Sequence, residues 1–265
     1  LKNLFIDLGS APPSNSNLKK KYKLVKENYN PLRVFVCKNC WLVQTQDFVN
    51  PDQIFNKNYN YFSGVSNFFL SHAKSFVKKI ISELQLNNKS FVIEIASNDG
   101  YLLQNFIKKK ISCLGIEPTE STAKIAKRKK IPVLVEFFSK KLAKKLSKKR
   151  KKADLIIGNN VYAHVPNIND FTDGLKLLLK KGGTITLEFP HLLKLIKENQ
   201  FDTIYHEHYS YLSLISVIRI FKKSKLKVWK VVKINTHGGS LRIYGCHEND
   251  LRKVDKSVSL LLKEE

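Results

Sequence analysis

The sequence predicts an α/β protein: a doubly wound, Rossmann-like sheet preceded by a small irregular module at the amino-terminal end. Three observations support this prediction. From residue 91 onward, short apolar segments alternate with segments of helical periodicity. The apolar segments are hydrophobic throughout, which is typical of parallel strands buried on both faces. Small residues follow the first of them and an acidic residue closes the second, as at the ligand-binding edge of such a sheet.

The elements of the core are predicted in order from this alternation. A helix over residues 67–86 comes first, because apolar side chains recur there at intervals of three and four. Two late strands over residues 227–232 and 240–244 are expected to pair as an antiparallel edge. The other strands are expected at residues 91–96, 112–117, 133–135, 155–158 and 184–188, and the other helices at residues 101–109, 121–129, 140–149, 170–179, 192–198 and 214–223.

The segment over residues 1–60 carries loop signals, such as the successive prolines Pro12 and Pro13, with thin apolar stretches between them. A segment of this kind is too thin to fold unaided, and a metal is a natural staple for it. Cys37 and Cys40 form one C-x-x-C pair. In a reducing compartment this spacing indicates metal or redox chemistry before it indicates a structural disulfide.

The composition limits the class of protein. The chain has 265 residues, 43% of them hydrophobic, which suffices for one sizeable core with a small appended module. No apolar run is long enough to cross a bilayer and no N-terminal stretch resembles a signal peptide, so a cytoplasmic protein with no membrane partner is expected. The sequence contains no methionine. We therefore expect that it begins inside a longer protein.

The formal net charge of +25 is compatible with a nucleic-acid-binding protein. The lysines are nevertheless spread over most of the chain, and the densest run, residues 140–152, places Leu142 and Leu146 four residues apart. This pattern is typical of a surface helix with a narrow apolar stripe, so no nucleic-acid partner is expected. A basic nucleic-acid-binding protein with a cysteine knuckle remains the alternative from another class, and it predicts tight, steeply salt-dependent binding.

The turn after the first predicted strand reads Glu94-Ile-Ala-Ser-Asn-Asp-Gly100 and leads into a helix. Its small residues let the backbone approach a ligand, and Glu117 at the end of the second strand can accept hydrogen bonds from ribose hydroxyls. Only Gly100 fits the G-x-G-x-x-G pattern, so a pyrophosphate cradle is not expected. A nucleoside without phosphates fits better, and S-adenosylmethionine is the common one. A tight turn that binds no ligand is the plainer alternative.

Five segments resemble the sugar C-methyltransferase family, whose members use S-adenosylmethionine to methylate carbon 3 of a nucleotide-linked 4-keto deoxyhexose. The segments are EIASNDGYLLQ (residues 94–104), LGIEP (114–118), GNNVYAHVP (158–166), FDTIYHEH (201–208) and THGGSLR (236–242). The match runs from about residue 7 to about residue 245, and its most specific part is residues 205–208. The resemblance implies the methyltransferase form of the sheet, S-adenosylmethionine as cofactor and a nucleotide-diphosphate sugar as substrate.

The resemblance also implies where the cofactor is bound. Glu117 is expected to hold the ribose. The full set of implied cofactor contacts is Glu94, Ala96, Ser97, Asn98, Asp99, Gly100 and Tyr101 around the methionine part, Glu117 and Pro118 at the ribose, Glu136, Phe137 and Phe138 beside the adenine, and Asn159 and Asn160 on the sulfonium side.

Members of this family carry an N-terminal zinc module with two knuckles and a second α/β domain after the core. The resemblance therefore implies that Cys37 and Cys40 are half of a structural zinc site whose other half precedes Leu1. A pair of free thiols is the alternative. The expected domains are a partial zinc-knuckle module (1–60), the methyltransferase core (61–248) and the start of a truncated C-terminal domain (249–265).

Methylation of a carbon atom requires a base that removes a proton beside a ketone and a donor that stabilises the enolate oxygen. Residues 205–208 supply both types of side chain. His208 is expected to be the base, because its unperturbed pKa lies near neutrality. Tyr205 is expected to donate to the keto or enolate oxygen, and Glu207 to orient a neighbouring group or to bind a sugar hydroxyl.

Further residues complete the predicted catalytic set. His164, just past the fourth strand, is expected to assist, and the resemblance implies a tyrosine ahead of the sheet, either Tyr59 or Tyr61. A metal site at residues 206–208 is an alternative, although its spacing is not H-E-x-x-H. The sequence thus predicts a C-methyltransferase that forms an enolate, with an O- or N-methyltransferase of the same fold as the second interpretation.

Overall fold

The computed structural model describes residues 3–14, 27–46, 55, 61–149 and 152–265. Tyr59, one of the two candidate tyrosines, lies outside these residues. Within them the core is a seven-stranded sheet with the strand order β10-β11-β8-β7-β4-β5-β6. Its strands are β4 (Phe91–Ile95), β5 (Ser112–Ile116), β6 (Val133–Leu134), β7 (Ala153–Asn159), β8 (Leu179–Pro190), β10 (Leu226–Ile234) and β11 (Ser240–His247).

The sheet is the doubly wound α/β sheet that the sequence predicts. Strands β4 to β8 run parallel to one another, and β11 is antiparallel to both β8 and β10. The expected antiparallel edge is therefore present. The chain forms β5 and then β6 on one side of β4 before it crosses to β7 on the other side, so the strand order reverses at β4. Ligands of open α/β sheets bind at this reversal, beyond the carboxyl ends of the strands.

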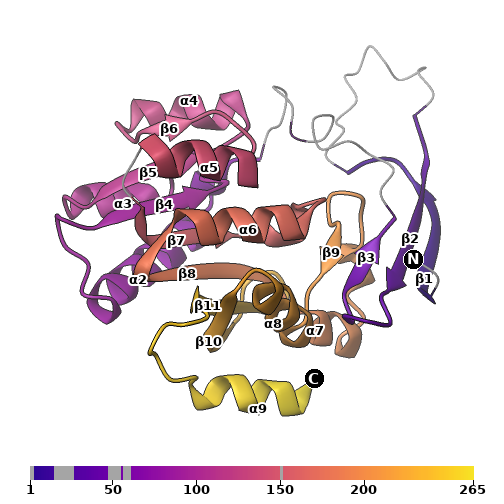
Figure 1. Ribbon diagram of the computed structural model, residues 1–265. Helices are drawn as coiled ribbons and strands as arrows, with labels where there is room; N and C mark the ends of the chain where they lie inside the picture. The colour runs from indigo at the N-terminus through magenta and orange to yellow at the C-terminus, as the bar shows by residue number, and fades with distance from the viewer. Residues whose placement is uncertain (1–2, 15–26, 47–54, 56–60, 150–151) are drawn as a thin grey trace.

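Helices cover both faces of this sheet (Figure 1). Alternate strand residues point to opposite faces, as Val92 and Ile93 of β4 show by belonging to different apolar clusters. Side chains of α5, α6, α8 and α9 pack on one face, and those of α2, α3 and α4 pack on the other. The helices are α2 (Asn67–Glu83), α3 (Leu103–Lys108), α4 (Glu120–Arg128), α5 (Lys140–Lys149), α6 (Ile168–Leu178), α7 (Leu192–Lys197), α8 (Leu214–Lys223) and α9 (Lys256–Glu264).

The amino-terminal module contributes a second, four-stranded sheet at the end of the molecule away from α3 and α4 (Figure 1). It consists of β1 (Asn3–Ala11), β2 (Asn30–Val36), β3 (Val43–Thr45) and β9 (Ser210–Tyr211), all paired antiparallel. Leu32 and Val34 of β2 pack against Leu192 and Tyr211. The loop signals of residues 1–60 gave no sign of this sheet, because its fourth strand comes from a distant part of the chain.

Residues 249–265, expected to begin a further domain, lie against the core in the structure. Val258 and Leu261 of α9 are buried in the cluster that includes β10 and α8. The Glu265 side chain accepts hydrogen bonds from the backbone N–H groups of Leu214 (2.7 Å) and Ile215 (2.9 Å), at the start of α8. No helix in the described ranges is both long and apolar enough to span a bilayer.

Candidate active site

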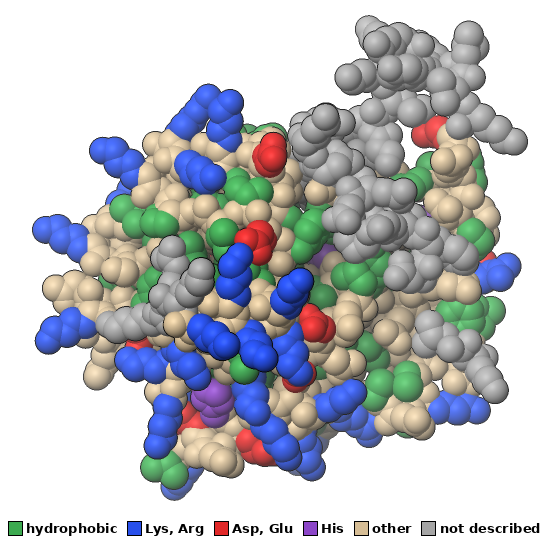
Figure 2. Space-filling view, turned by 45° about the horizontal axis from the view of Figure 1, so that its top comes forward, with side chains coloured by type: hydrophobic (Ala, Val, Ile, Leu, Met, Phe, Trp, Pro, Cys, Tyr) green, Lys and Arg blue, Asp and Glu red, His purple; other side chains and the backbone are tan. Residues whose placement is uncertain are grey.

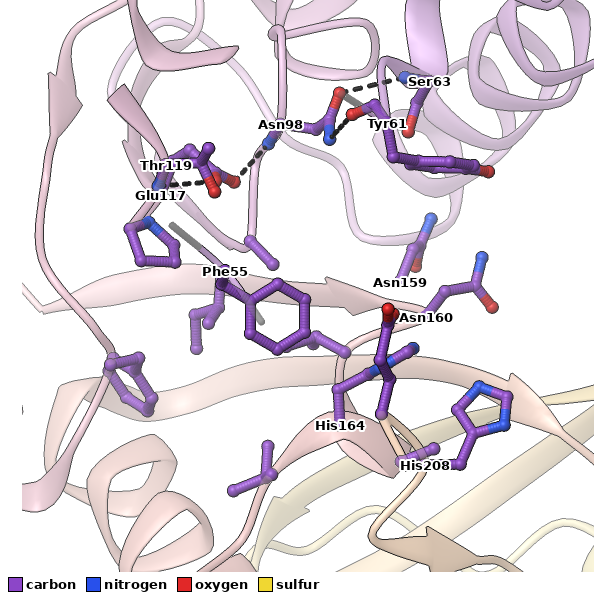
Figure 3. Close-up of a pocket in the computed structure, with 18 of the residues that line it drawn as sticks. Phe55, Tyr61, Ser63, Asn98, Glu117, Thr119, Asn159, Asn160, His164 and His208 are labelled. Atoms are coloured by element: carbon purple, nitrogen blue, oxygen red, sulfur yellow. Dashed lines mark hydrogen bonds between the residues drawn. The ribbon is translucent and has the colours of Figure 1, made fainter. Parts of the chain in front are cut away.

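A cavity of about 870 Å³ opens at the carboxyl edge of β4, β5 and β7 (Figure 3). Its volume lies within the range of about 300–1,000 Å³ that is usual for small-molecule sites. Residues far apart in the sequence meet around it. Fourteen of the predicted site residues line it: Tyr61, Ala96, Asn98, Tyr101, Glu117, Pro118, Phe137, Phe138, Asn159, Asn160, His164, Tyr205, Glu207 and His208.

The turn after β4 has the compact geometry that its small residues predict. Ala96 (φ 55°), Asn98 (φ 49°) and Gly100 (φ 75°) all adopt left-handed backbone conformations. At Gly100 a Cβ atom would lie 2.4 Å from the side chain of Ile131, so both the conformation and the close packing require glycine. The turn thereby brings its backbone to the rim of the cavity.

Glu117 follows β5 and is buried at the edge of the cavity. Its two carboxylate oxygens accept hydrogen bonds from the backbone N–H groups of Asn98 (2.8 Å) and Thr119 (2.9 Å), as Figure 3 shows. Burial raises the pKa of Glu117, and these N–H donors oppose that effect. A carboxylate has about four acceptor positions, so Glu117 retains the capacity to accept hydroxyl groups of a ligand.

Asn159 and Asn160, at the end of β7, line the same part of the cavity. The side-chain oxygens of both residues are buried and have no hydrogen-bond partner among the described residues. Buried acceptors normally find a donor, so these two oxygens suit a ligand that carries N–H groups or a positive charge. The hydroxyl of Tyr101 lies nearby, and burial raises its pKa well above the ordinary value, which keeps it protonated.

Five predicted cofactor residues do not line the cavity: Glu94, Ser97, Asp99, Gly100 and Glu136. Glu94 is buried in β4 behind the turn, and burial together with the nearby Glu117 holds its pKa well above the ordinary value. Asp99 contacts the ammonium group of Lys129 at 3.3 Å. A carboxylate oxygen of Glu136 lies 3.7 Å from the ammonium nitrogen of Lys145 at the surface, where both side chains are exposed to solvent. These residues support the turn or face solvent in this structure.

The Tyr205–His208 segment supplies the acid–base part of the cavity. It follows the short helix η4 (Phe201–Thr203), and a backbone hydrogen bond of 3.0 Å from His208 to Tyr205 closes it into a turn. Tyr205, Glu207 and His208 line the cavity. His206 turns the other way, and its Nε2 donates to the Pro31 carbonyl of β2 at 3.2 Å.

The hydrogen bonds of His208 define its tautomer. Nδ1 lies 2.8 Å from the carbonyl oxygen of Thr203, which can only accept, so Nδ1 carries the proton. Nε2 is then an acceptor, and the Tyr205 hydroxyl donates to it at 3.0 Å. Burial lowers the pKa of His208 to about 4, while the hydrogen bond to Thr203 acts in the opposite direction. His208 is therefore a neutral imidazole with its lone pair on Nε2.

A second imidazole lies against the first. His164 belongs to the short helix η3 (Tyr162–His164), and its ring centroid is 4.7 Å from that of His208 (Figure 3). Burial, followed by the proximity of His208, holds the pKa of His164 well below the ordinary value. Two protonated rings at this separation would repel each other, so the arrangement favours two neutral imidazoles.

Glu207 is buried in the cavity wall, and the Ser14 hydroxyl donates to one of its carboxylate oxygens at 3.2 Å. Ser14 follows strand β1, so the amino-terminal module reaches the cavity. Tyr61 stands at the mouth with 46% of its surface exposed, and burial of the remainder raises its pKa. The four candidate catalytic residues of the core and Tyr61 thus share one chamber.

Sequence reasoning missed several residues of the cavity wall, including Ser14, Phe55, Asp170 and Asp202. No local motif marks them, because they reach the cavity only through long-range packing. His237, in the segment THGGSLR (residues 236–242), was not among the predicted site residues. It lines the cavity in a left-handed conformation (φ 48°), with its ring stacked on Phe69 at a centroid distance of 5.4 Å.

The cysteine pair lies in the turn between β2 and β3, and neither thiol lines the cavity. Backbone N–H groups, first that of Cys40, lower the pKa of Cys37. Among the described residues no group of three or more His, Cys, Asp or Glu side chains could hold a metal ion. Residues 206–208 therefore do not form the alternative metal site. A structural zinc site takes four ligands, so the two thiols do not complete one.

The charge of the cavity differs from that of the molecule as a whole. Lysine and arginine side chains extend over much of the surface in Figure 2, in keeping with the net charge of +25. The described residues that line the cavity nevertheless include no lysine or arginine. Their charged members are four carboxylates, those of Glu117, Asp170, Asp202 and Glu207. Such a lining suits a cationic group of a ligand.

The strand order, the turn after β4 and the acidic residue after β5 define an S-adenosylmethionine-dependent methyltransferase fold. A family model described as "Methyltransferase domain" matches residues 69–231, and the chain belongs to this family. A second model, described as "Putative zinc binding domain", matches residues 1–55.

Comparison with individual proteins agrees with this family. The chain is 29% identical over 260 residues to the C-methyltransferase NovU of Streptomyces niveus, an alignment that covers 98% of the chain and 62% of NovU. The chain thus spans less than two thirds of that relative's length.

Solved structures share the fold at low sequence identity. An S-adenosylmethionine-dependent methyltransferase from Clostridium acetobutylicum is 13% identical with a TM-score of 0.54, covering 66% of this chain and 91% of its own. The magnesium protoporphyrin IX methyltransferase of Synechocystis PCC 6803 with bound SAH is 14% identical with a TM-score of 0.53, covering 73% and 90%.

Proposed function

We propose that this chain is the catalytic core of an S-adenosylmethionine-dependent C-methyltransferase that acts on a nucleotide-linked keto-deoxysugar. One observation carries the proposal: a single cavity joins the cofactor edge of the sheet to the Tyr205–His208 segment and His164. The similarity to NovU, whose name gives it as a C-methyltransferase, supports the choice of carbon as the methylated atom.

S-adenosylmethionine supplies an electrophilic methyl group on a sulfonium cation. Within the chain, Glu117 would accept the ribose hydroxyls, and Asn159 and Asn160, which line the cavity with unpartnered oxygens, would face the cationic part. The cavity lining carries carboxylates and, among the described residues, no lysine or arginine. This charge favours binding of the sulfonium cation. The protein must then generate a carbon nucleophile and hold it in line with the methyl group.

His208 generates the nucleophile. Its Nε2 lone pair removes the proton from the carbon beside the ketone, and the proton stays on Nε2. The carbonyl of Thr203 holds Nδ1–H throughout, so it fixes the ring and stabilises the imidazolium that forms. In the resting state the Tyr205 hydroxyl donates to Nε2. When that hydroxyl donates to the substrate's keto oxygen instead, the lone pair becomes available and the enolate oxygen gains its donor.

The test separates carbon methylation from methylation of oxygen or nitrogen. The full-length protein is incubated in D₂O with S-adenosylhomocysteine and a thymidine-diphosphate 4-keto-6-deoxyhexose, and the sugar is analysed by NMR. We expect deuterium to replace hydrogen at the carbon beside the ketone, at a rate on the order of 10²-fold above buffer. With S-adenosylmethionine the same carbon should gain a methyl group. Methylation of a hydroxyl or amine without exchange would establish the alternative function.

A further inference from the structure

We infer that Asn98 is a positioning residue that ties the cofactor turn to Tyr61. The inference rests on the proposed function and adds to it a role for the Asn98 side chain. That side chain was expected to contact the cofactor. In the structure its amide group is instead occupied by the chain itself.

Among the described residues the Asn98 side chain makes three hydrogen bonds, and each is to a backbone group. Oδ1 accepts from the N–H of Ser63 (2.9 Å) and from that of Asp99 (2.9 Å). Nδ2 donates to the carbonyl of Tyr61 (2.9 Å). Figure 3 shows the bonds to Tyr61 and Ser63 as a bridge between the turn after β4 and the segment 61–65. Asn98 itself is buried, and its bonds to Tyr61 and Ser63 are partly buried.

The same residue also contacts the ribose-binding side of the site. Its backbone N–H donates to Glu117 at 2.8 Å. The left-handed conformation of Asn98 (φ 49°) lets the backbone face Glu117 while the side chain faces segment 61–65. Asparagine tolerates this conformation better than most residues with a side chain. One residue therefore joins the carboxylate at the ribose side to the segment that carries Tyr61.

A second contact joins segment 61–65 to the turn after β4, where Gly64 lies against the side chain of Asp99. A Cβ atom at Gly64 would lie 2.2 Å from a carboxylate oxygen of Asp99, so a larger residue here would displace the Asp99 side chain. Tyr61 lines the cavity, and in Figure 3 its ring extends on the side of Asn159 and Asn160. Tyr61 thus stands where the cofactor half and the acid–base half of the cavity meet, and the bonds of Asn98 hold its backbone there.

The test uses Asn98→Asp, which keeps the shape and the acceptor for Ser63. The substitution replaces the donor to Tyr61 with an oxygen that repels its carbonyl. We expect kcat to fall about tenfold while the Kd of S-adenosylhomocysteine changes less than about threefold. If Asn98 acts through Tyr61, the double variant N98D/Y61F should have the same kcat as Y61F alone. Additive losses, or loss of S-adenosylhomocysteine binding, would overturn the inference.

Asn87→Asp is the matched control. Asn87, on the exposed turn between α2 and β4, also accepts from a backbone N–H, that of Lys89 (2.9 Å), and donates to a backbone carbonyl, that of Gln85 (3.5 Å). It makes the same kinds of bond away from the cavity, so N87D should leave kcat unchanged.

Hydrogen exchange tests the inference independently of any sugar substrate. In Asn98→Ala, which removes the acceptor of the Ser63 N–H, the amide of Ser63 should exchange faster than in the wild type, and in Asn87→Ala it should not. Unchanged exchange in Asn98→Ala would refute the bridge. Failure of the enzyme to methylate any keto sugar would refute the proposed function and leave the exchange result to decide the bridge.

Discussion

The two halves of the cavity are built in different ways. The cofactor half is formed by turns that directly follow β4, β5 and β7, with Glu117 held by two backbone N–H groups. The acid–base half is assembled from separate parts of the chain, which include Tyr61, His164 and the Tyr205–His208 segment. The first half is thus a property of the sheet edge, and the second depends on how distant segments pack.

The support of the acid–base half comes largely from the amino-terminal sheet. The Thr45 hydroxyl of β3 donates to the carbonyl of His208, and His206 donates to the Pro31 carbonyl of β2. Ser14 donates to Glu207. The module that carries the cysteine pair therefore also holds the Tyr205–His208 segment in place. Substitutions in the acid–base half should therefore affect the chemistry, and those in the cofactor half should affect cofactor affinity.

The largest effect is expected for His208→Gln. Glutamine cannot take up the proton, so the rate of methyl transfer and that of deuterium exchange should both fall about 10³-fold. The Kd of S-adenosylhomocysteine, measured by titration calorimetry, should stay within about twofold, since His208 belongs to the acid–base half.

His206→Gln is the matched control for this variant. The same chemical change is made two residues away, on a side chain that faces β2 and does not line the cavity. Its methyl-transfer rate per folded molecule should match that of the wild type. Equal losses in the two variants would mean that the segment, and not the His208 imidazole, is what the reaction requires.

The same contrast explains what was predictable from the sequence. The alternation of apolar and amphipathic segments predicted the sheet and its antiparallel edge, because burial on both faces leaves a strong local pattern. Glu117 and the turn at Asn98 were identified because a short, contiguous motif follows each strand. Residues such as Ser14 and Phe55 had no such signal, since long-range packing alone brings them to the cavity.

Local sequence does not predict the role of a residue where tertiary contacts decide that role. The sequence favoured His208 as the base but gave no role to His206 outside the metal alternative, and the structure turns His206 toward β2 and His208 into the cavity. Glu136, expected beside the adenine, lies instead near Lys145 on the surface. The strands of the amino-terminal sheet were missed because their apolar stretches are short and lie among loop signals, and β9, which completes the sheet, lies more than 160 residues later in the chain.

The second effect is on stability and concerns the burial of His208. Its pKa is lowered from 6.5 to about 4 in the folded protein, so between these pH values the unfolded chain binds the additional proton. The free energy of unfolding therefore falls as the pH drops through this window. Between pH 7 and pH 4.5 the contribution of His208 amounts to roughly 2 kcal/mol.

Urea unfolding of the wild type and of His208→Gln at both pH values measures this contribution. The other histidines are common to both proteins and cancel in the difference, so the wild type should lose roughly 2 kcal/mol more than the variant on acidification. Parallel losses would show that His208 is not held neutral in the folded state, and its role as the base would then fail.

The smallest effect is expected for Glu117→Gln in the cofactor half. One oxygen becomes an amide that faces a backbone N–H, either that of Asn98 or that of Thr119, and the negative charge beside the ribose is lost. The Kd of S-adenosylhomocysteine should rise about tenfold, the loss expected for one charge-assisted hydrogen bond. Deuterium exchange at saturating S-adenosylhomocysteine should remain near the wild-type rate, because His208 is untouched.

Glu120→Gln, an exposed neighbour in the first turn of α4, should change neither value. If Glu117→Gln slowed exchange at saturation as strongly as His208→Gln does, Glu117 would be required for the chemistry and the division of the cavity into two halves would be wrong.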